Sequence, residues 1–314
     1  MHMADALISP VVGGAGWAAT LALAAYSARK IKVAADDTSV PMMGVGAAFV
    51  FAAQMINFTI PGTGSSGHLG GGLILAALLG PHAAFLAMAS ILTVQALFFA
   101  DGGLLALGCN VINLGFFPCF LAYPLLFRPI AGQGPTRARL TAAAMIAAIV
   151  GLQLGAFGVV LETKLSGNTA LPMGTFLLLM QPIHLAIGIV EGLATAAVLL
   201  FVWQARPGIL HAGSARPDAG AGAVSKKLVA AFLVATLAMG AVLSWFASSR
   251  PDGLEWAVAK ASSVAEKVAP IADETTWPAV DAGTSLAGVV GAALTLVVAG
   301  AIGFAARRRF AAKG

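Results

Sequence analysis

Apolar residues occur in long runs along this chain, and the polar residues gather in the short stretches between them. A helix that spans a bilayer needs about 20 consecutive apolar residues, and several runs suit that length. They cover 7–27, 42–60, 105–127, 139–162, 176–204, 227–247 and 284–306. This pattern predicts an all-α, polytopic membrane protein.

The apolar stretch 64–99 can form one long helix or two short helices broken at Gly80-Pro81, since proline ends or kinks a helix. The positions of lysine and arginine decide between these two arrangements, because these residues concentrate in short cytoplasmic loops. The basic clusters lie at 29–32, 128–139, 206–227 and 307–313. An even number of crossings between the first two clusters requires 64–80 and 81–99 to be separate spans. We expect a seven-helix bundle plus two C-terminal transmembrane helices, with the N-terminus outside and the C-terminus cytoplasmic.

Composition supports a membrane location. The chain of 314 residues is 59% hydrophobic and only 10% charged, with a mean hydropathy of +0.90, and so lacks the polar surface that a soluble globule needs. Its net charge of +5 comes from loops between spans, so we expect the lipid bilayer as a partner and no nucleic acid. The first basic cluster follows the first apolar run, so we expect that run to stay as a helix and not to be cleaved as a signal peptide.

A change in composition divides the chain. Residues 206–226 are rich in Gly, Ala, Pro and Arg, which is typical of a flexible linker. We therefore predict a membrane domain at 1–205, a cytoplasmic linker at 206–226, and a smaller domain at 227–314. In the outside loop 248–283, the periodic apolar residues of 254–268 predict a short amphipathic helix near the membrane surface.

The first two residues form a candidate metal chelator. The α-amine of Met1, the amide nitrogen of His2 and the His2 imidazole can close fused five- and six-membered rings around one ion. We expect Met1 to be retained, because its aminopeptidase requires a small second residue. His68, predicted on the same outer face, offers a fourth nitrogen, and a planar set of four nitrogens is typical of Ni(II) or Cu(II). A structural, hydrogen-bonded histidine is the alternative for His68.

Other polar residues lie within the apolar runs. Gln54 and Asn57 are three residues apart on one helical face, where they can fix a histidine tautomer or make ordinary interhelical hydrogen bonds. His184 and Glu191 share one stripe of the helix 176–204, and we interpret them as a structural ion pair or a packing contact. Asp101, beside two glycines, is expected to cap a helix or loop.

Several motifs together resemble the substrate-capture membrane component of energy-coupling-factor nickel and cobalt transporters, the CbiM/NikM type. They are Met1-His2, Phe-Ala-Ala-Gln-Met-Ile-Asn-Phe at 51–58, Ser-Gly-His-Leu at 66–69 and Ala-Asp-Gly-Gly-Leu at 100–104. The resemblance covers roughly residues 1–205. The tail carries Pro-Asp-Gly-Leu-Glu at 251–255, similar to the NikN-like accessory subunit, which implies a natural fusion. Family members often carry proline and glycine shortly after Met-His, whereas this chain continues Met3-Ala4-Asp5-Ala6.

The resemblance implies a metal site made of Met1, His2 and His68, with Ni(II) or Co(II) as the transported substrate. It also implies two kinds of partner, a transmembrane energy-coupling subunit and a pair of cytoplasmic ATPase subunits. It further implies that the coupling subunit docks on a face of small residues, Ala18, Ala22 and Ala25. The alternative is that this face packs within the chain itself.

The chain has no phosphate-cradling Gly-x-x-x-x-Gly-Lys-Ser/Thr motif, so we expect a transporter subunit without its own ATPase activity, and not an enzyme. Two other functions stay open from the sequence: a stand-alone secondary metal permease and an intramembrane metalloenzyme. The sequence has no His-Glu-x-x-His motif that would favour the metalloenzyme.

Overall fold

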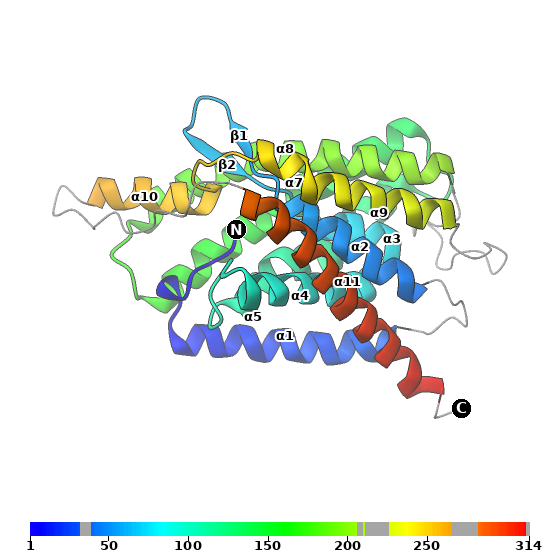
Figure 1. Ribbon diagram of the computed structural model, residues 1–314. Coiled ribbons are helices and arrows are strands. Elements are labelled where there is room, and N and C mark those ends of the chain that lie inside the picture. The colour runs from blue at the N-terminus through cyan, green and yellow to red at the C-terminus, as the bar shows by residue number, and fades with distance from the viewer. Residues whose placement is uncertain (32–38, 206–209, 211–225, 266–281, 312–314) are drawn as a thin grey trace.

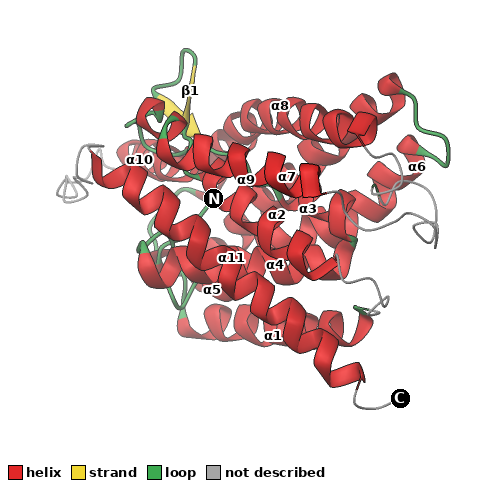
Figure 2. Cartoon of the chain, turned by 45° about the vertical axis from the view of Figure 1, so that its right-hand side comes forward, coloured by secondary structure: helices red, strands yellow, loops and turns green. Residues whose placement is uncertain are grey.

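The computed structural model describes residues 1–31, 39–205, 210, 226–265 and 282–311, and it is a bundle of long helices (Figures 1 and 2). The helices are η1 (Asp5–Leu7), α1 (Pro10–Lys30), α2 (Ser39–Gln54), α3 (Gly72–Leu79), α4 (Pro81–Phe98), α5 (Leu107–Val111), η2 (Ile112–Phe127), α6 (Arg128–Ala131), α7 (Arg137–Ser166), α8 (Met173–Ala205), α9 (Lys226–Ala241), η4 (Leu243–Phe246), α10 (Gly253–Ala265) and α11 (Ala282–Ala311). Within these ranges, 6 helical segments are long and apolar enough to cross a membrane. The prediction of an all-α polytopic membrane protein is confirmed.

The predicted spanning helix at 64–80 is wrong. The second apolar helix, α2, ends at Gln54, and the chain then forms an antiparallel hairpin of β1 (Phe58–Ile60) and β2 (Ser65–Gly67), with Phe58 opposite Gly67. Only the 8 residues of α3 follow as helix, a rise of about 12 Å. A hairpin and a half-length helix therefore take the place of one continuous spanning helix.

Glycine explains this break in the helical pattern. The stretch 61–72 is rich in glycine, which has poor helix propensity. Gly71 adopts a φ of 76°, and a Cβ atom there would lie 2.4 Å from Cγ1 of Val50 on α2. Irregular backbone at membrane depth is tolerated where protein surrounds it, and the loop between β2 and α3 lies in such a place.

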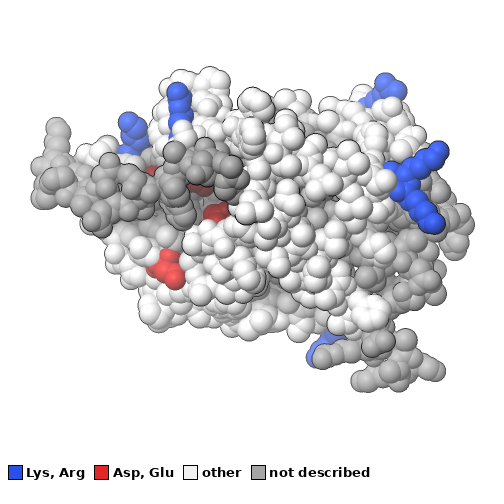
Figure 3. Space-filling view, viewed as in Figure 1, with Lys and Arg blue, Asp and Glu red and all other residues white. Residues whose placement is uncertain are grey.

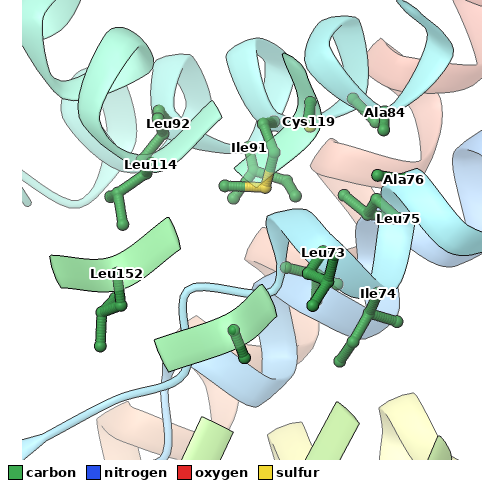
Figure 4. Close-up of a cluster of buried hydrophobic side chains, with 14 of the residues drawn as sticks. Leu73, Ile74, Leu75, Ala76, Ala84, Ile91, Leu92, Leu114, Cys119 and Leu152 are labelled. Carbon is green, nitrogen blue, oxygen red and sulfur yellow. The ribbon is translucent and has the colours of Figure 1, made fainter. Parts of the chain in front are cut away.

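Helix α3 forms the centre of the hydrophobic core. All residues from Gly72 to Leu78 are buried, and the helix contacts α2, α4, α7, α8 and η2. Figure 4 shows Leu73, Ile74 and Leu75 of α3 close to side chains of these neighbours. A helix that is apolar on every side is one that the rest of the bundle encloses.

The span formed by α5, η2 and α6 runs continuously from Leu107 to Ala131. Its central segment, η2, is a π-helix that contains Pro118 and Pro124. Proline has no N–H to donate, and π-helical turns are one way in which a helix accommodates a local interruption of its hydrogen bonds. This segment packs against α3, α4 and α7.

Helix α8 has one face toward the protein and one face away from it. Leu178, Leu185 and Leu193 are exposed, as expected of a lipid-facing stripe. His184 and Glu191 lie on the opposite face, where both are buried. The two titratable side chains of this span therefore point into the bundle.

The two ends of the bundle differ in charge. The N-terminus, the hairpin and α10 lie toward one end (Figure 1). At the opposite end, the described charged residues visible on the face in Figure 3 are Lys and Arg, whereas the end with α10 carries both signs. The predicted linker lies almost wholly outside the described residues, as does 266–281 of the predicted outside loop.

Helix α1 offers a matched test of close helix packing. A Cβ atom on Gly16 would lie 2.6 Å from Sγ and 2.9 Å from the backbone nitrogen of Cys109, whereas a Cβ on Gly14 would meet nothing within 4 Å. Gly16→Ala should therefore lower the free energy of unfolding by about 1–3 kcal/mol, through overpacking. Gly14→Ala should leave it unchanged or raise it by up to about 1 kcal/mol, since alanine is the better helix former. Denaturant unfolding of the detergent-solubilised protein measures both, and equal effects would contradict the packing of α1 on α5.

Candidate metal site

The N-terminal segment is held inside the bundle by its backbone. Met3 N–H donates to Asn110 Oδ1 at 2.8 Å, and the Met3 carbonyl accepts from Gly103 N at 2.8 Å and from Asn110 Nδ2 at 3.2 Å. Asp5 Oδ1 accepts from Ala106 N at 3.0 Å. Met1 and Met3 are both buried. The backbone of Met3 and the carboxylate of Asp5 thus fix the segment that follows Met1 and His2.

Met1, His2 and His68 come together at this point, although 67 residues separate the first from the last. The α-amine of Met1 lies 3.4 Å from Nε2 of His68. The His2 and His68 rings stack with centroids 5.0 Å apart and an interplanar angle of 30°. The structure therefore places the amine and both imidazoles around one small volume.

The tautomer of His68 follows from its backbone contact. His68 Nδ1 lies 3.0 Å from the carbonyl oxygen of Leu69, which can only accept a hydrogen bond. The proton is therefore on Nδ1, and Nε2 carries the lone pair. That lone-pair nitrogen is the one that faces the Met1 amine.

The tautomer of His2 is set by a relay of two glutamines. The carbonyl of Gly70 accepts from Gln54 Nε2 at 2.8 Å, Gln54 Oε1 accepts from Gln95 Nε2 at 2.7 Å, and Gln95 Oε1 lies 3.1 Å from His2 Nε2. Because the Gly70 carbonyl fixes the direction of the first bond, His2 Nε2–H must donate the last one. His2 Nδ1 then carries the lone pair, 3.4 Å from Oδ1 of Asp101.

Three polar residues that the sequence singled out have the following contacts. Gln54 reaches His2 only through Gln95, whose part in the relay the sequence did not indicate. Asn57 contacts neither histidine. Its backbone carbonyl accepts a hydrogen bond from Ser248 N at 2.7 Å, and its buried side-chain Oδ1 has no hydrogen-bond partner among the described residues. Asp101 was expected to cap a helix or loop, but its carboxylate faces His2 instead.

Of the two expectations for Glu191 and His184, an ion pair or a packing contact, the structure excludes the ion pair. The two carboxylate oxygens of Glu191 accept from the backbone N–H groups of Gly70 and Gly71, each at 3.0 Å. Gly71 is the N-cap of α3, so the glutamate binds the end of that helix where its dipole favours a negative charge. This buried carboxylate holds the loop that carries His68.

The segment 250–252 docks on the hairpin strand that leads to His68. Ser66 N–H donates to the carbonyl of Pro251 at 2.8 Å, and Ser66 Oγ donates to the carbonyl of Arg250 at 2.7 Å. Asp252 Oδ2 then lies 3.2 Å from the Met1 amine. The C-terminal part of the chain therefore contributes a carboxylate to the site.

The other residues of the Pro-Asp-Gly-Leu-Glu motif begin helix α10 and pack it on α8. Glu255 N–H donates to Asp252 Oδ1 at 2.8 Å, and Asp252 N–H donates to Glu255 Oε2 at 3.1 Å, which is a reciprocal capping box at the start of α10. A Cβ atom on Gly253 would lie 3.0 Å from Ile187 and 3.2 Å from His184. Leu254 is buried. The motif starts a helix and presses it against α8.

Burial and charge keep the two imidazoles neutral. Burial and the positive N-terminus lower the pKa of His2 to about 3, against the opposing effects of Asp252 and of the hydrogen bond to Gln95. Burial, the N-terminus and His2 lower the pKa of His68 to about 4. Burial alone would raise the pKa of Asp252, but the N-terminal ammonium and His68 lower it below its ordinary range. At neutral pH the site therefore holds two neutral imidazoles and an ionised carboxylate.

A small pocket lies beside these groups. Its polar lining includes Met1, His68, His184 and Asp252, and Leu114, Leu152 and Ile187 form much of its apolar wall. In the part of the chain that the structure describes, no group of three or more His, Cys, Asp or Glu side chains is arranged to hold a metal ion. A metal bound at this point would need backbone nitrogens in addition to side chains.

The helical bundle and its buried, nitrogen-lined N-terminus define a class of multi-pass membrane protein. The sequence matches the family CbiM, "Cobalt uptake substrate-specific transmembrane region", over residues 2–209, and a PDGLE domain over 226–308. The chain belongs to the CbiM family and ends in a PDGLE domain, and it is a metal transport protein rather than an enzyme.

Named relatives cover one or both parts of the chain. A putative fused nickel transport protein NikMN of Archaeoglobus fulgidus is 33% identical, with 98% of each chain covered. A cobalt transport protein CbiM of Sorangium cellulosum is 31% identical over 67% of this chain and 94% of its own. A crystal structure of a transition metal transporter superposes with a TM-score of 0.58 at 30% identity, over 66% of this chain and 94% of that one.

Replacing Glu191 tests the attachment of the His68 loop. In Glu191→Gln, one of the two glycine N–H groups faces an amide NH2 and loses its acceptor, so the free energy of unfolding should fall by about 1–3 kcal/mol. Denaturant unfolding in detergent measures the change. Leu193→Ala, two residues along α8 on the exposed face, is the control and should change stability by less than about 0.5 kcal/mol. Unchanged stability in Glu191→Gln would contradict the role of the carboxylate.

Proposed function

We propose that this protein is the substrate-capture subunit of an ATP-driven energy-coupling-factor importer for Ni(II), with Co(II) as the other candidate substrate. In this proposal the mature chain begins at Met1. The ion is bound by the Met1 amine, the amide nitrogen and Nδ1 of His2, and Nε2 of His68. The observation that carries the proposal is the 3.4 Å approach of the Met1 amine to His68 Nε2.

The geometry supports a planar set of four nitrogens. In the fused rings formed by Met1 and His2, the amide nitrogen is the middle donor, so the fourth donor lies opposite it and next to the amine. With metal–nitrogen distances of about 2 Å, neighbouring donors at a right angle lie about 2.8 Å apart. The amine and His68 Nε2, 3.4 Å apart, need to approach by about 0.6 Å to reach that spacing. Both imidazoles present the lone-pair nitrogen that such a site needs.

The surrounding charges also support binding of a divalent cation. Asp252 and Asp101 place carboxylates beside the amine and His2. A divalent ion with one deprotonated amide keeps a net positive charge, which these carboxylates offset in a buried site. Planar coordination by nitrogen favours nickel over the other first-row candidate, cobalt.

Transport requires partners and a direction. We propose that the end of the bundle with the N-terminus faces outside and that the C-terminus is cytoplasmic, as the basic loops favour. Ala18, Ala22 and Ala25 of α1 are exposed, so this face is available to a transmembrane coupling subunit. A pair of ATPase subunits would supply the energy, since the sequence carries no phosphate-binding loop of its own.

Loss of any donor should abolish high-affinity binding. His2→Ala, His68→Ala and a two-residue extension ahead of Met1 should each weaken Ni(II) binding to the purified chain by more than about 100-fold, beyond the ~10–100-fold that loss of an outer partner costs. Isothermal titration calorimetry measures the affinity.

The control is His82→Ala. His82 packs against Tyr26 and Phe120, away from the candidate site, and its loss should leave nickel binding intact. Retained affinity in the extended chain would refute the role of the amine.

Proton release on binding follows from the imidazole pKa values. With the pKa of His2 at about 3 and of His68 at about 4, both rings are already neutral at pH 7 and release nothing. The two backbone nitrogens are the remaining donors, so at most about two protons should be released per Ni(II). Because the bound state holds fewer protons, affinity should rise with pH. Calorimetry in buffers of different ionisation enthalpy counts the protons, and a count of three or four would show that the imidazoles were charged.

A further inference from the structure

His184 is a buried histidine with one nitrogen left over. Its side chain is 1% exposed, and Nδ1 donates to the carbonyl of Met180, one turn back on α8, at 2.8 Å. The lone pair is therefore on Nε2, which has no hydrogen-bond partner among the described residues. Burial of a polar atom without a partner is costly, so the position calls for a function.

The unpaired nitrogen belongs to the pocket beside the proposed metal site. His184 lines that pocket together with Met1, His68 and Asp252, and the rest of the lining is largely apolar. His184 is the one imidazole on this lining that the four-nitrogen set does not use. Neutral imidazole nitrogen is a common ligand for nickel, cobalt and zinc.

Contacts along α8 place His184 under the motif and next to the loop of His68. Gly253 of the Pro-Asp-Gly-Leu-Glu motif lies against His184 and Ile187. Gly67 also lies against Ile187, and Gly70 lies against Glu191 further along the helix. The motif therefore covers His184, and the loop of His68 begins about one turn further along α8. An ion that enters beneath the motif would meet His184 and the Asp252 carboxylate in the pocket that His68 also lines.

We propose that His184 Nε2 is a transient nitrogen donor that takes up the divalent ion, with a carboxylate oxygen of Asp252 beside it, and passes it to Met1, His2 and His68. The inference rests on the proposed function, because it assigns a loading step to the same site. A planar set of four nitrogens has no fifth place in its plane, so His184 acts before that set is complete. It should therefore govern the rate of loading and leave the final complex unchanged.

The test uses the purified, untagged full-length chain in detergent. Ni(II) is mixed with it in a stopped-flow instrument, and the absorbance of the planar complex is followed. His184→Phe keeps a ring without a donor, whereas His184→Cys supplies a donor without a ring. His82→Phe is the matched control, because it removes a histidine ring from a site remote from the pocket.

A donor role and a packing role give opposite results. If His184 is a donor, His184→Phe should load about tenfold more slowly, an effect of the size seen when one supporting partner is lost from a metal site. His184→Cys and His82→Phe should load at close to the normal rate, and all variants should reach the same final spectrum. Normal loading by His184→Phe would overturn the proposal, as would slow loading by both variants at position 184. If His184→Phe does not fold, His184→Leu, which also lacks a donor, replaces it with the same expectations.

This inference and the proposed function fail in distinguishable ways. Absence of the planar spectrum in the unaltered chain would count against the four-nitrogen site itself. A normal planar spectrum that forms at the same rate with and without a donor at position 184 would count against the loading step alone.

Discussion

The candidate site depends on the anchoring of Met3. Its N–H and carbonyl are bonded to Asn110 and Gly103, and these bonds draw the first residues of the chain into the bundle. A terminal ammonium is costly to bury, and here the carboxylate of Asp252 and the lone pair of His68 face it. Without the anchor, a flexible terminus would lose this position, because ordering a backbone residue costs about 1–2 kcal/mol.

The groups around the amine are positioned by elements from every part of the chain. Glu191 of α8 holds the loop of His68, and Gln54 and Gln95 connect that loop to His2. Asp252 arrives from the PDGLE domain. These bonds leave the lone pair of His68 on the side of the amine and the lone pair of His2 on Nδ1, the nitrogen that can close a chelate ring with the amine. The accessory domain forms part of the site and does not merely follow it in the sequence.

The sequence predicted what depends on local pattern. The apolar runs predicted the spanning helices, and the chelating chemistry of Met1-His2 together with His68 predicted which residues meet. The half-helix α3 and the hairpin before it were missed, because the stretch is apolar enough to span and only the contacts of its glycines with α2 and α8 show why it does not. Gln95, Glu191 and Asp252 were given no such roles, because their partners lie between 41 and 251 residues away. The periodicity of apolar residues in a sequence cannot predict a hydrogen bond between residues that far apart.

The central claim is that an unmodified leading amine completes a planar nitrogen site. The most direct measurement is the nickel K-edge X-ray absorption spectrum of the purified, untagged protein, with the mass of its N-terminal peptide determined on the same sample. Four nitrogen donors in a plane, two of them imidazoles, on a chain that starts at a free Met1 are the predicted result. Six-coordinate nickel rich in oxygen donors, or tight nickel binding by a chain that lacks the free Met1 amine, would contradict it.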